Sequence, residues 1–306
     1  MIYKYEYPGG VWVDVERPSQ EEIQILARQF NISDRLETEL FSPTPFPLVA
    51  GDDNTTLLVL HFPAYETDGG ETRVQEVDFI IGSNFLITVR YEIIVPLHHL
   101  RKLFETQEIT GEGHKLSTDI LIEILFAHLY TSARNHANHL AENLSRTERE
   151  MFQKQERKTV QEIAEISREF LHLESAIVNQ EEPLTQFFNM LTTRGIFDAS
   201  FPERAGRVLA ERAQVERLIE MRRAIASELR ETNSALLETR QNEIIKFLTV
   251  ITFIALPLQF IASVFGMNLP GTPFREHPEA FAIVAGIMLI AALTMLFYFA
   301  RKHWIF

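Results

Sequence analysis

The chain has 306 residues, a net charge of −13 and no cysteine. The acidic balance argues against a nucleic-acid partner, and the absence of cysteine excludes disulfides and thiolate zinc sites. This length accommodates one sizeable soluble domain plus a short membrane segment. The N-terminal stretch MIYKYEYPGG lacks the charged start and apolar core of a signal peptide, so we expect the soluble part to stay in the cytoplasm.

Residues 1–115 are expected to form a cytosolic α/β domain. Ser19 and Glu22 have the spacing of a capping box, which predicts a helix from Pro18 to about Phe30. Short segments rich in β-branched and aromatic residues predict strands, and the turn residues Gly82 to Asn84 join the last two as a hairpin. The predicted strands are Val11 to Val15, Leu57 to Phe62, Val74 to Ile81 and Phe85 to Val89.

The chain becomes helical after this domain. Residues 116–201 predict cytosolic helical arms, Ser117 to Met151 and about Lys158 to Gln180, antiparallel if Pro183 and Gly195 end the second arm. Residues 202–246 predict a stalk helix with charges of alternating sign. Because neither Pro nor Gly occurs between Gly206 and Pro257, we expect the stalk to continue without a break into the next segment.

Two long uncharged runs lie at the C-terminus. The first, residues 247–268, is long enough to span a bilayer core, since its apolar part reaches roughly 28 Å as a helix. The second covers residues 281–300, after a loop at 269–280 and before a basic cytosolic tail at 301–306. These runs predict a two-span hairpin in the bilayer, and the basic residues flanking it place both termini in the cytoplasm and the loop outside.

A polar stripe follows one face of the stalk and first span. Its residues recur at alternating steps of three and four, which is a heptad pattern. Polar side chains within a membrane tend to face protein or water, so the stripe indicates several copies around a water path. The alternative is that its Thr and Ser residues bond back to their own helix and pack a dimer. The stripe comprises Asn242, Ile245, Thr249, Thr252, Leu256, Gln259 and Ser263.

The end of the first span carries the triplet Gly266-Met267-Asn268. Together with Asn242-Glu243, Lys246, Pro257-Leu258 and the tail Lys302-His303-Trp304, it resembles the CorA family of divalent-cation channels, whose signature is a Gly-Met-Asn triplet at the outer end of the first of two spans. The resemblance implies a homopentameric channel for magnesium, with cobalt and nickel as further ions, in the cell's inner membrane. It also implies that the triplet forms the selectivity filter.

Ion selection is expected to rest on the water shell of the ion. Mg²⁺ gives up water reluctantly, so a ring of Asn268 amides would bind it through water, helped by carbonyls of Gly266 and Met267. Below this mouth, Leu256 interrupts the polar stripe, and with Leu248 it would form an apolar gate. A membrane potential of about 100 mV supplies ~4.6 kcal/mol to a divalent ion, so no ATP site or cofactor is needed.

Three alternatives stay open. The first is a zinc transporter of the ZntB-like branch, which the loop after Asn268 resembles and which would depend on Glu276, His277 and Glu279. The second is a non-transporting scaffold anchored by the hairpin. An enzyme is the third, and we find no catalytic motif to support it.

The spacing of His128, His136, His139 and Glu142 is compatible with a zinc site, although such a set is more typical of a solvated helix face.

Overall fold

A computed structural model describes residues 1–64, 73–110, 116–153, 156–267 and 278–302. The chain divides into two compact units, Met1–Arg230 and Glu231–Phe306, which are treated separately below.

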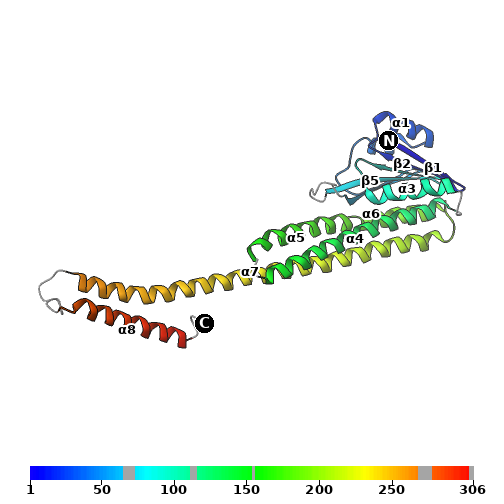
Figure 1. The fold of residues 1–306 in the computed structure, drawn as a ribbon. Coiled ribbons are helices and arrows are strands. Elements are labelled where there is room, and N and C mark those ends of the chain that lie inside the picture. Colours follow the sequence, from blue (N-terminus) through cyan, green and yellow to red (C-terminus); the bar gives the residue numbers. More distant parts are fainter. Residues whose placement is uncertain (65–72, 111–115, 154–155, 268–277, 303–306) are drawn as a thin grey trace. The chain divides into compact units, whose positions relative to one another are not determined.

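The first unit is built on a mixed six-stranded sheet (Figure 1). Its order is β1-β2-β6-β5-β4-β3, in which β2 and β6 run parallel and every other neighbouring pair is antiparallel. The four predicted strands are present, whereas β1 and β3 were not predicted. The strands are β1 (Ile2–Tyr7), β2 (Gly10–Glu16), β3 (Leu48–Gly51), β4 (Thr56–Ala64), β5 (Arg73–Ile81) and β6 (Phe85–Arg90).

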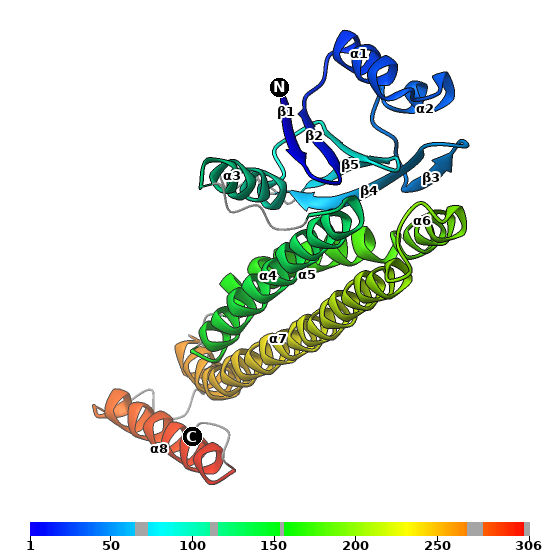
Figure 2. The same cartoon turned by 90° about the vertical axis from the view of Figure 1, so that its right-hand side faces the viewer.

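One face of the sheet is covered by α1 (Gln20–Phe30) and α2 (Asp34–Glu39), as Figure 2 shows. The predicted capping box is confirmed, because the Ser19 hydroxyl accepts the Glu22 N–H and the Glu22 carboxylate accepts the Ser19 N–H. The apolar core beneath these helices combines α1 side chains with alternate residues of the central strands. Its members include Val13, Val15, Ile23, Leu26, Leu36, Ile80, Ile87 and Val89.

The opposite face carries four helices: α3 (Val95–Thr110), α4 (Thr118–Phe152), α5 (Glu156–Val178) and α6 (Glu181–Arg194). Aromatic rings join them to the sheet, with Phe79 stacked on Phe126 at 4.9 Å between centroids and Trp12 against Phe104 at 5.6 Å. Pro183 lies in the first turn of α6, where a missing N–H breaks no helical bond, so it does not end the second arm as expected.

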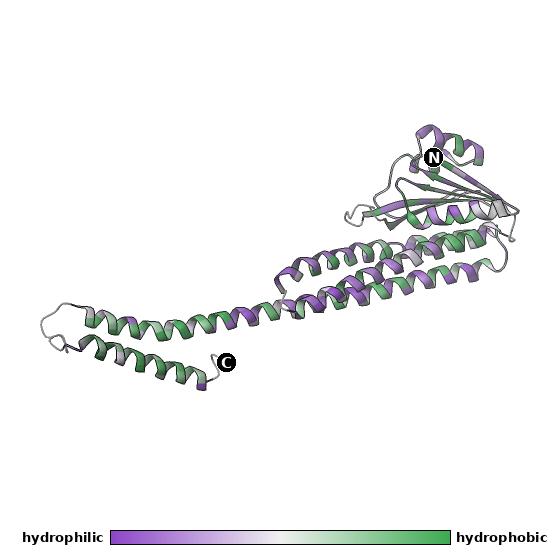
Figure 3. Ribbon diagram, viewed as in Figure 1, coloured by the Kyte–Doolittle hydropathy of each residue, from purple (hydrophilic) through white to green (hydrophobic). Residues whose placement is uncertain are grey.

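The helix α7 runs without interruption from Phe201 to Gly266 and contains Pro257. Figure 3 shows that its C-terminal part and α8 (Ala280–Arg301) are apolar along their length, whereas α4 and α5 alternate in hydropathy. Both α7 and α8 contain a segment long and apolar enough to cross a bilayer. The predicted fold class is therefore confirmed: an α/β domain, then long helices, one of which continues as the first of two apolar C-terminal segments.

Candidate ion pathway

The polar stripe lies at the surface of the single chain. Thr249 is half-buried, and the other six positions are exposed, with Leu256 at 60% and Ile245 at 54%. Neighbouring faces of α7 are equally open, since Phe260 is 70% exposed. Exposure therefore does not single out the stripe. Its chemistry does, because it gathers amide and hydroxyl side chains, whereas the other exposed positions from Ile244 to Ala262 are apolar.

The threonine hydroxyls of the stripe are already hydrogen-bonded within the helix. Thr249 donates to the Ile245 carbonyl at 2.8 Å, and Thr252 donates to the Leu248 carbonyl at 2.9 Å. These are the back-bonds expected in the alternative of simple packing. They also fix the hydroxyl orientation, so that the oxygen lone pairs remain as acceptors for water around a cation.

The Gly266-Met267-Asn268 triplet lies only partly within the described residues. Gly266 is the last residue of α7, and Met267 follows it outside the helix with 51% of its surface exposed. A Cβ added to Gly266 would find no other atom within 4 Å. Among the described residues, therefore, no side chain or backbone atom requires glycine at this position. Asn268 and the loop residues Glu276 and His277 lie outside the described residues.

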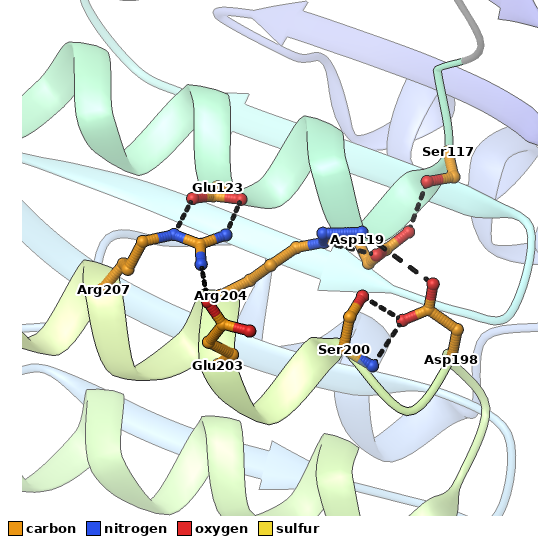
Figure 4. Close-up of polar contacts among 8 residues, drawn as sticks. All are labelled: Ser117, Asp119, Glu123, Asp198, Ser200, Glu203, Arg204 and Arg207. Carbon is orange, nitrogen blue, oxygen red and sulfur yellow. Dashed lines mark hydrogen bonds and ion pairs between the residues drawn. The ribbon is translucent and has the colours of Figure 1, made fainter.

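At its other end, α7 is fastened to α4 by arginine–carboxylate pairs (Figure 4). Arg204 donates through Nε to Oδ2 of Asp119 at 2.8 Å, and Asp119 also accepts the Ser117 hydroxyl. One turn on, Arg207 binds Glu123 in a bidentate pair through one edge of its guanidinium, Nε to Oε1 at 2.7 Å and Nη2 to Oε2 at 3.1 Å. The positive charges of Arg204 and Arg207 are therefore neutralised by carboxylates on α4.

The surroundings of these pairs are also polar. Arg207 donates to Glu203 on its own helix at 2.8 Å, and Arg204 approaches Asp198 at 3.8 Å. The Ser200 hydroxyl and N–H donate to Asp198 and hold the pKa of that carboxyl below its usual value.

Further along α7, Arg212 extends the attachment to other helices. Its buried guanidinium donates to the Ile177 carbonyl at 3.1 Å and pairs with Glu181 and Glu216 at 3.3 and 3.0 Å. Arg223 on α7 pairs with Glu174 on α5. The N-terminal half of α7 is thus held to α4, α5 and α6 at several points.

The histidine set suggested by spacing does not form a metal site. His136 is buried whereas His139 is exposed, and among the described residues no group of three or more His, Asp or Glu side chains is placed to hold a metal ion. Burial, with a smaller contribution from His139, lowers the pKa of His136 to about 4.

An α/β domain attached to a long helix that ends as one of two apolar segments, with a polar stripe on that helix, is an architecture that favours a membrane transport protein. The match to a family model confirms this class and refines it. The chain belongs to the family of CorA-like Mg2+ transporter proteins, whose model matches residues 8–301. The resemblance inferred from the sequence is therefore correct.

Curated relatives and solved structures match almost the whole chain. The cobalt/magnesium transport protein CorA of Thermotoga maritima is 22% identical over 96% of this chain and 83% of its own. The protein of the same name from Methanocaldococcus jannaschii is 22% identical over 96% of this chain and 91% of its own. The complete structure of the CorA magnesium transporter from M. jannaschii superposes with a TM-score of 0.81 at 20% identity, covering 97% and 92% of the two chains.

Proposed function

We propose that this chain is the subunit of a homopentameric channel that admits divalent cations into the cell, with Mg²⁺ as the main ion and Co²⁺ and Ni²⁺ as further ones. The observation that carries the proposal is the stripe on α7: one helix is fastened to the soluble unit at its start and presents a polar line through its apolar end. Membership of the CorA-like Mg2+ transporter family supports the interpretation of this polar line as the path of a divalent cation.

Several copies are needed because two helices cannot enclose water. The stripe from Asn242 to Ser263 is open in the single chain, and its amide and hydroxyl groups are poorly matched to lipid. Arranged around an axis, the copies would turn this line inward and leave α8 toward the bilayer. We take the number of copies, five, from the resemblance to the family.

The ion would be selected with most of its water in place. Between Lys246 and the loop the chain offers no carboxylate, imidazole or thiolate. Strong inner-sphere bonds are therefore unavailable, whereas Asn268 amides and the carbonyls of Gly266 and Met267 accept hydrogen bonds from bound water. Gln259 and the Thr249 and Thr252 hydroxyls would continue this acceptor path inward.

An apolar constriction would close the path. Leu256 is the large apolar residue within the membrane part of the stripe, and Leu248 lies two turns before it on a neighbouring face. A ring of such side chains excludes water when narrow, and water exclusion blocks a hydrated ion. In this proposal both termini lie on the cytoplasmic side of the inner membrane. An inside-negative potential of about 100 mV then supplies ~4.6 kcal/mol for each divalent ion that enters.

Relatives named for cobalt and magnesium support magnesium over the zinc alternative. The test is uptake of Mg²⁺, Co²⁺, Ni²⁺ and Zn²⁺, one ion at a time, into liposomes that hold the purified protein, with an imposed inside-negative potential. We expect Mg²⁺ uptake that grows with the potential and needs no nucleotide. Protein-free liposomes are the control. Uptake of Zn²⁺ alone would favour the ZntB-like alternative, and no uptake of any ion would favour the scaffold.

A further inference from the structure

A groove lies between the two apolar segments of the second unit. Figure 1 shows that α8 runs back along the end of α7. The volume of the groove is about 590 Å³, within the ~300–1,000 Å³ that small-molecule sites occupy. It is lined by residues of both helices and by the residue that follows α8: Thr249, Phe253 and Pro257 from α7, Thr294, Met295, Tyr298 and Phe299 from α8, and Lys302. Since Thr249 and Pro257 lie eight residues apart on one helix, the groove extends for ~12 Å along α7.

The walls of this groove consist mainly of apolar side chains, and the threonine hydroxyls among them are already hydrogen-bonded. Phe253 and Phe299 form an edge-to-face pair across it, 6.2 Å between ring centroids. Its two threonine hydroxyls are satisfied locally, because Thr249 donates to the Ile245 carbonyl at 2.8 Å and Thr294 donates to the Ile290 carbonyl at 2.7 Å. The walls therefore suit a hydrocarbon chain better than an ion or water.

One end of the groove is cationic. Lys302 lines it and follows the last residue of α8, with its ammonium 5.8 Å from the centre of the Tyr298 ring. Arg301 precedes it and does not line the groove. Two positive charges here outweigh the partial negative charge of a helix C-terminus. An apolar cleft with a cation where the span meets water matches the two parts of an anionic lipid.

We propose that this groove binds one anionic phospholipid from the leaflet at the C-terminal end of α8, with an acyl chain along Phe253 and Phe299 and the phosphate at Lys302. The inference depends on the membrane placement of the two segments and is independent of which ion is transported. Thr249 belongs to both the groove and the polar stripe, so the lipid would lie directly beside the helix proposed to line the pore. The competing occupant is a side chain from a neighbouring copy.

The charge requirement is tested on the full-length oligomer in detergent by native mass spectrometry and by thermal unfolding, with phosphatidylglycerol or phosphatidylcholine added. We expect one phosphatidylglycerol retained per subunit and a higher Tm, with phosphatidylcholine giving neither. Lys302→Ala should abolish both effects. Arg301→Ala, which removes the same charge one residue away, should preserve them. Equal responses in the two variants, or equal responses to the two lipids, would overturn the proposal.

The apolar requirement is tested by filling the groove. Met295→Trp places a large ring at a groove position and should release the lipid, whereas Leu296→Trp on the exposed face of α8 should not. Glycerol phosphate, which has the headgroup charge without acyl chains, should give no shift in Tm. Retention of phosphatidylglycerol by the Met295→Trp variant, or a full shift with glycerol phosphate, would exclude acyl-chain binding. A cross-link from a cysteine placed at position 295 to a neighbouring copy, with no lipid retained, would assign the groove to the subunit interface.

Discussion

Arg204 on α7 reaches Asp119 on α4 with an Nε–Oδ2 distance of 2.8 Å, although 85 positions separate the two residues in the sequence. The Asp119 side chain is only 7% exposed, and that of Arg204 is 19% exposed. The pair therefore joins the start of the long helix to the helical layer beneath the sheet through a largely dehydrated contact. One turn further on, the Arg207 side chain is 49% exposed in its pair with Glu123.

This difference in exposure predicts different costs for the two arginines. Arg204→Ala leaves the Asp119 carboxylate without its charged donor and should lower the free energy of unfolding by about 1.5–3 kcal/mol. Arg207→Ala removes a solvent-screened pair and should cost much less. The measurement is urea unfolding followed by the fluorescence of buried Trp12, in a Trp304→Phe background so that Trp12 alone reports. Equal losses would show that burial of the Asp119 pair does not govern its strength.

His136 predicts loss of stability in acid. Its pKa is about 4 in the folded protein and about 6.5 when unfolded, so the unfolded chain binds the proton first as the pH falls. Stability should be unaffected above pH ~6.5 and decline by about 3 kcal/mol as the pH falls toward about 4. Glu169, 3.8 Å from the ring, would offset part of this loss once the imidazole is charged.

The pH profile of the unfolding midpoint checks this prediction. His136→Asn should flatten the profile between pH 6.5 and 4, because the titrating group is gone. The matched control is His172→Asn, which makes the same substitution at an exposed histidine of α5. A profile that stays steep in the His136 variant would assign the acid sensitivity to other groups.

Local patterns made much of this protein predictable. The Ser19–Glu22 capping box and the heptad spacing of the stripe depend on residues within a few turns of each other. The fold class follows from patterns of similarly short range, the strand-like segments and the two long uncharged runs. Strand β1 was missed although exposed Lys4 and Glu6 alternate with less exposed tyrosines, as in a half-buried strand, and β3 was missed because Gly51 and only four residues give it little signal. Both lie at the edges of the sheet, where pairing with β2 and β4 rather than composition defines them.

The long-range contacts could not be read from the sequence. Arg204 and Arg207 appear there as a basic stretch, because their carboxylate partners on α4 are more than 80 positions away. Similarly, the histidines of α4 have a spacing compatible with a metal, yet packing buries His136 and leaves His139 in solvent. The filter assignment to Asn268 and the gate assignment to Leu248 and Leu256 remain predictions.

Asn268→Ala should abolish divalent-cation transport while leaving assembly intact. The amide at the end of the polar stripe offers the best uncharged acceptor for the water shell of an ion, and alanine offers none. Uptake into liposomes reports transport, and size-exclusion chromatography reports the oligomer. Wild-type uptake by a correctly assembled variant would remove Asn268 from the filter.

Leu256→Asn should raise the basal flux. Its exposed isobutyl group interrupts a polar line, and an amide of similar size would let water enter the constriction. Leu258→Asn is the matched control, because it makes the same change on the side of α7 away from the stripe. The leak is measured as uptake without an imposed potential. An unchanged leak in the Leu256 variant would indicate that this residue packs the helices rather than closing the pore.

Cobalt hexaammine should block Mg²⁺ uptake. Its six ammine ligands do not exchange, and they present hydrogen-bond donors in nearly the octahedral arrangement of hydrated Mg²⁺. A filter of neutral acceptors recognises such a shell from outside, whereas a carrier that strips water from zinc would not. The measurement is Mg²⁺ uptake into liposomes with and without external cobalt hexaammine. Spermidine, a flexible amine of the same charge, is the control for simple charge screening and should block far less. Full uptake in the presence of cobalt hexaammine, together with loss of transport on replacing Glu276, His277 and Glu279, would reverse both the ion and the mechanism proposed here.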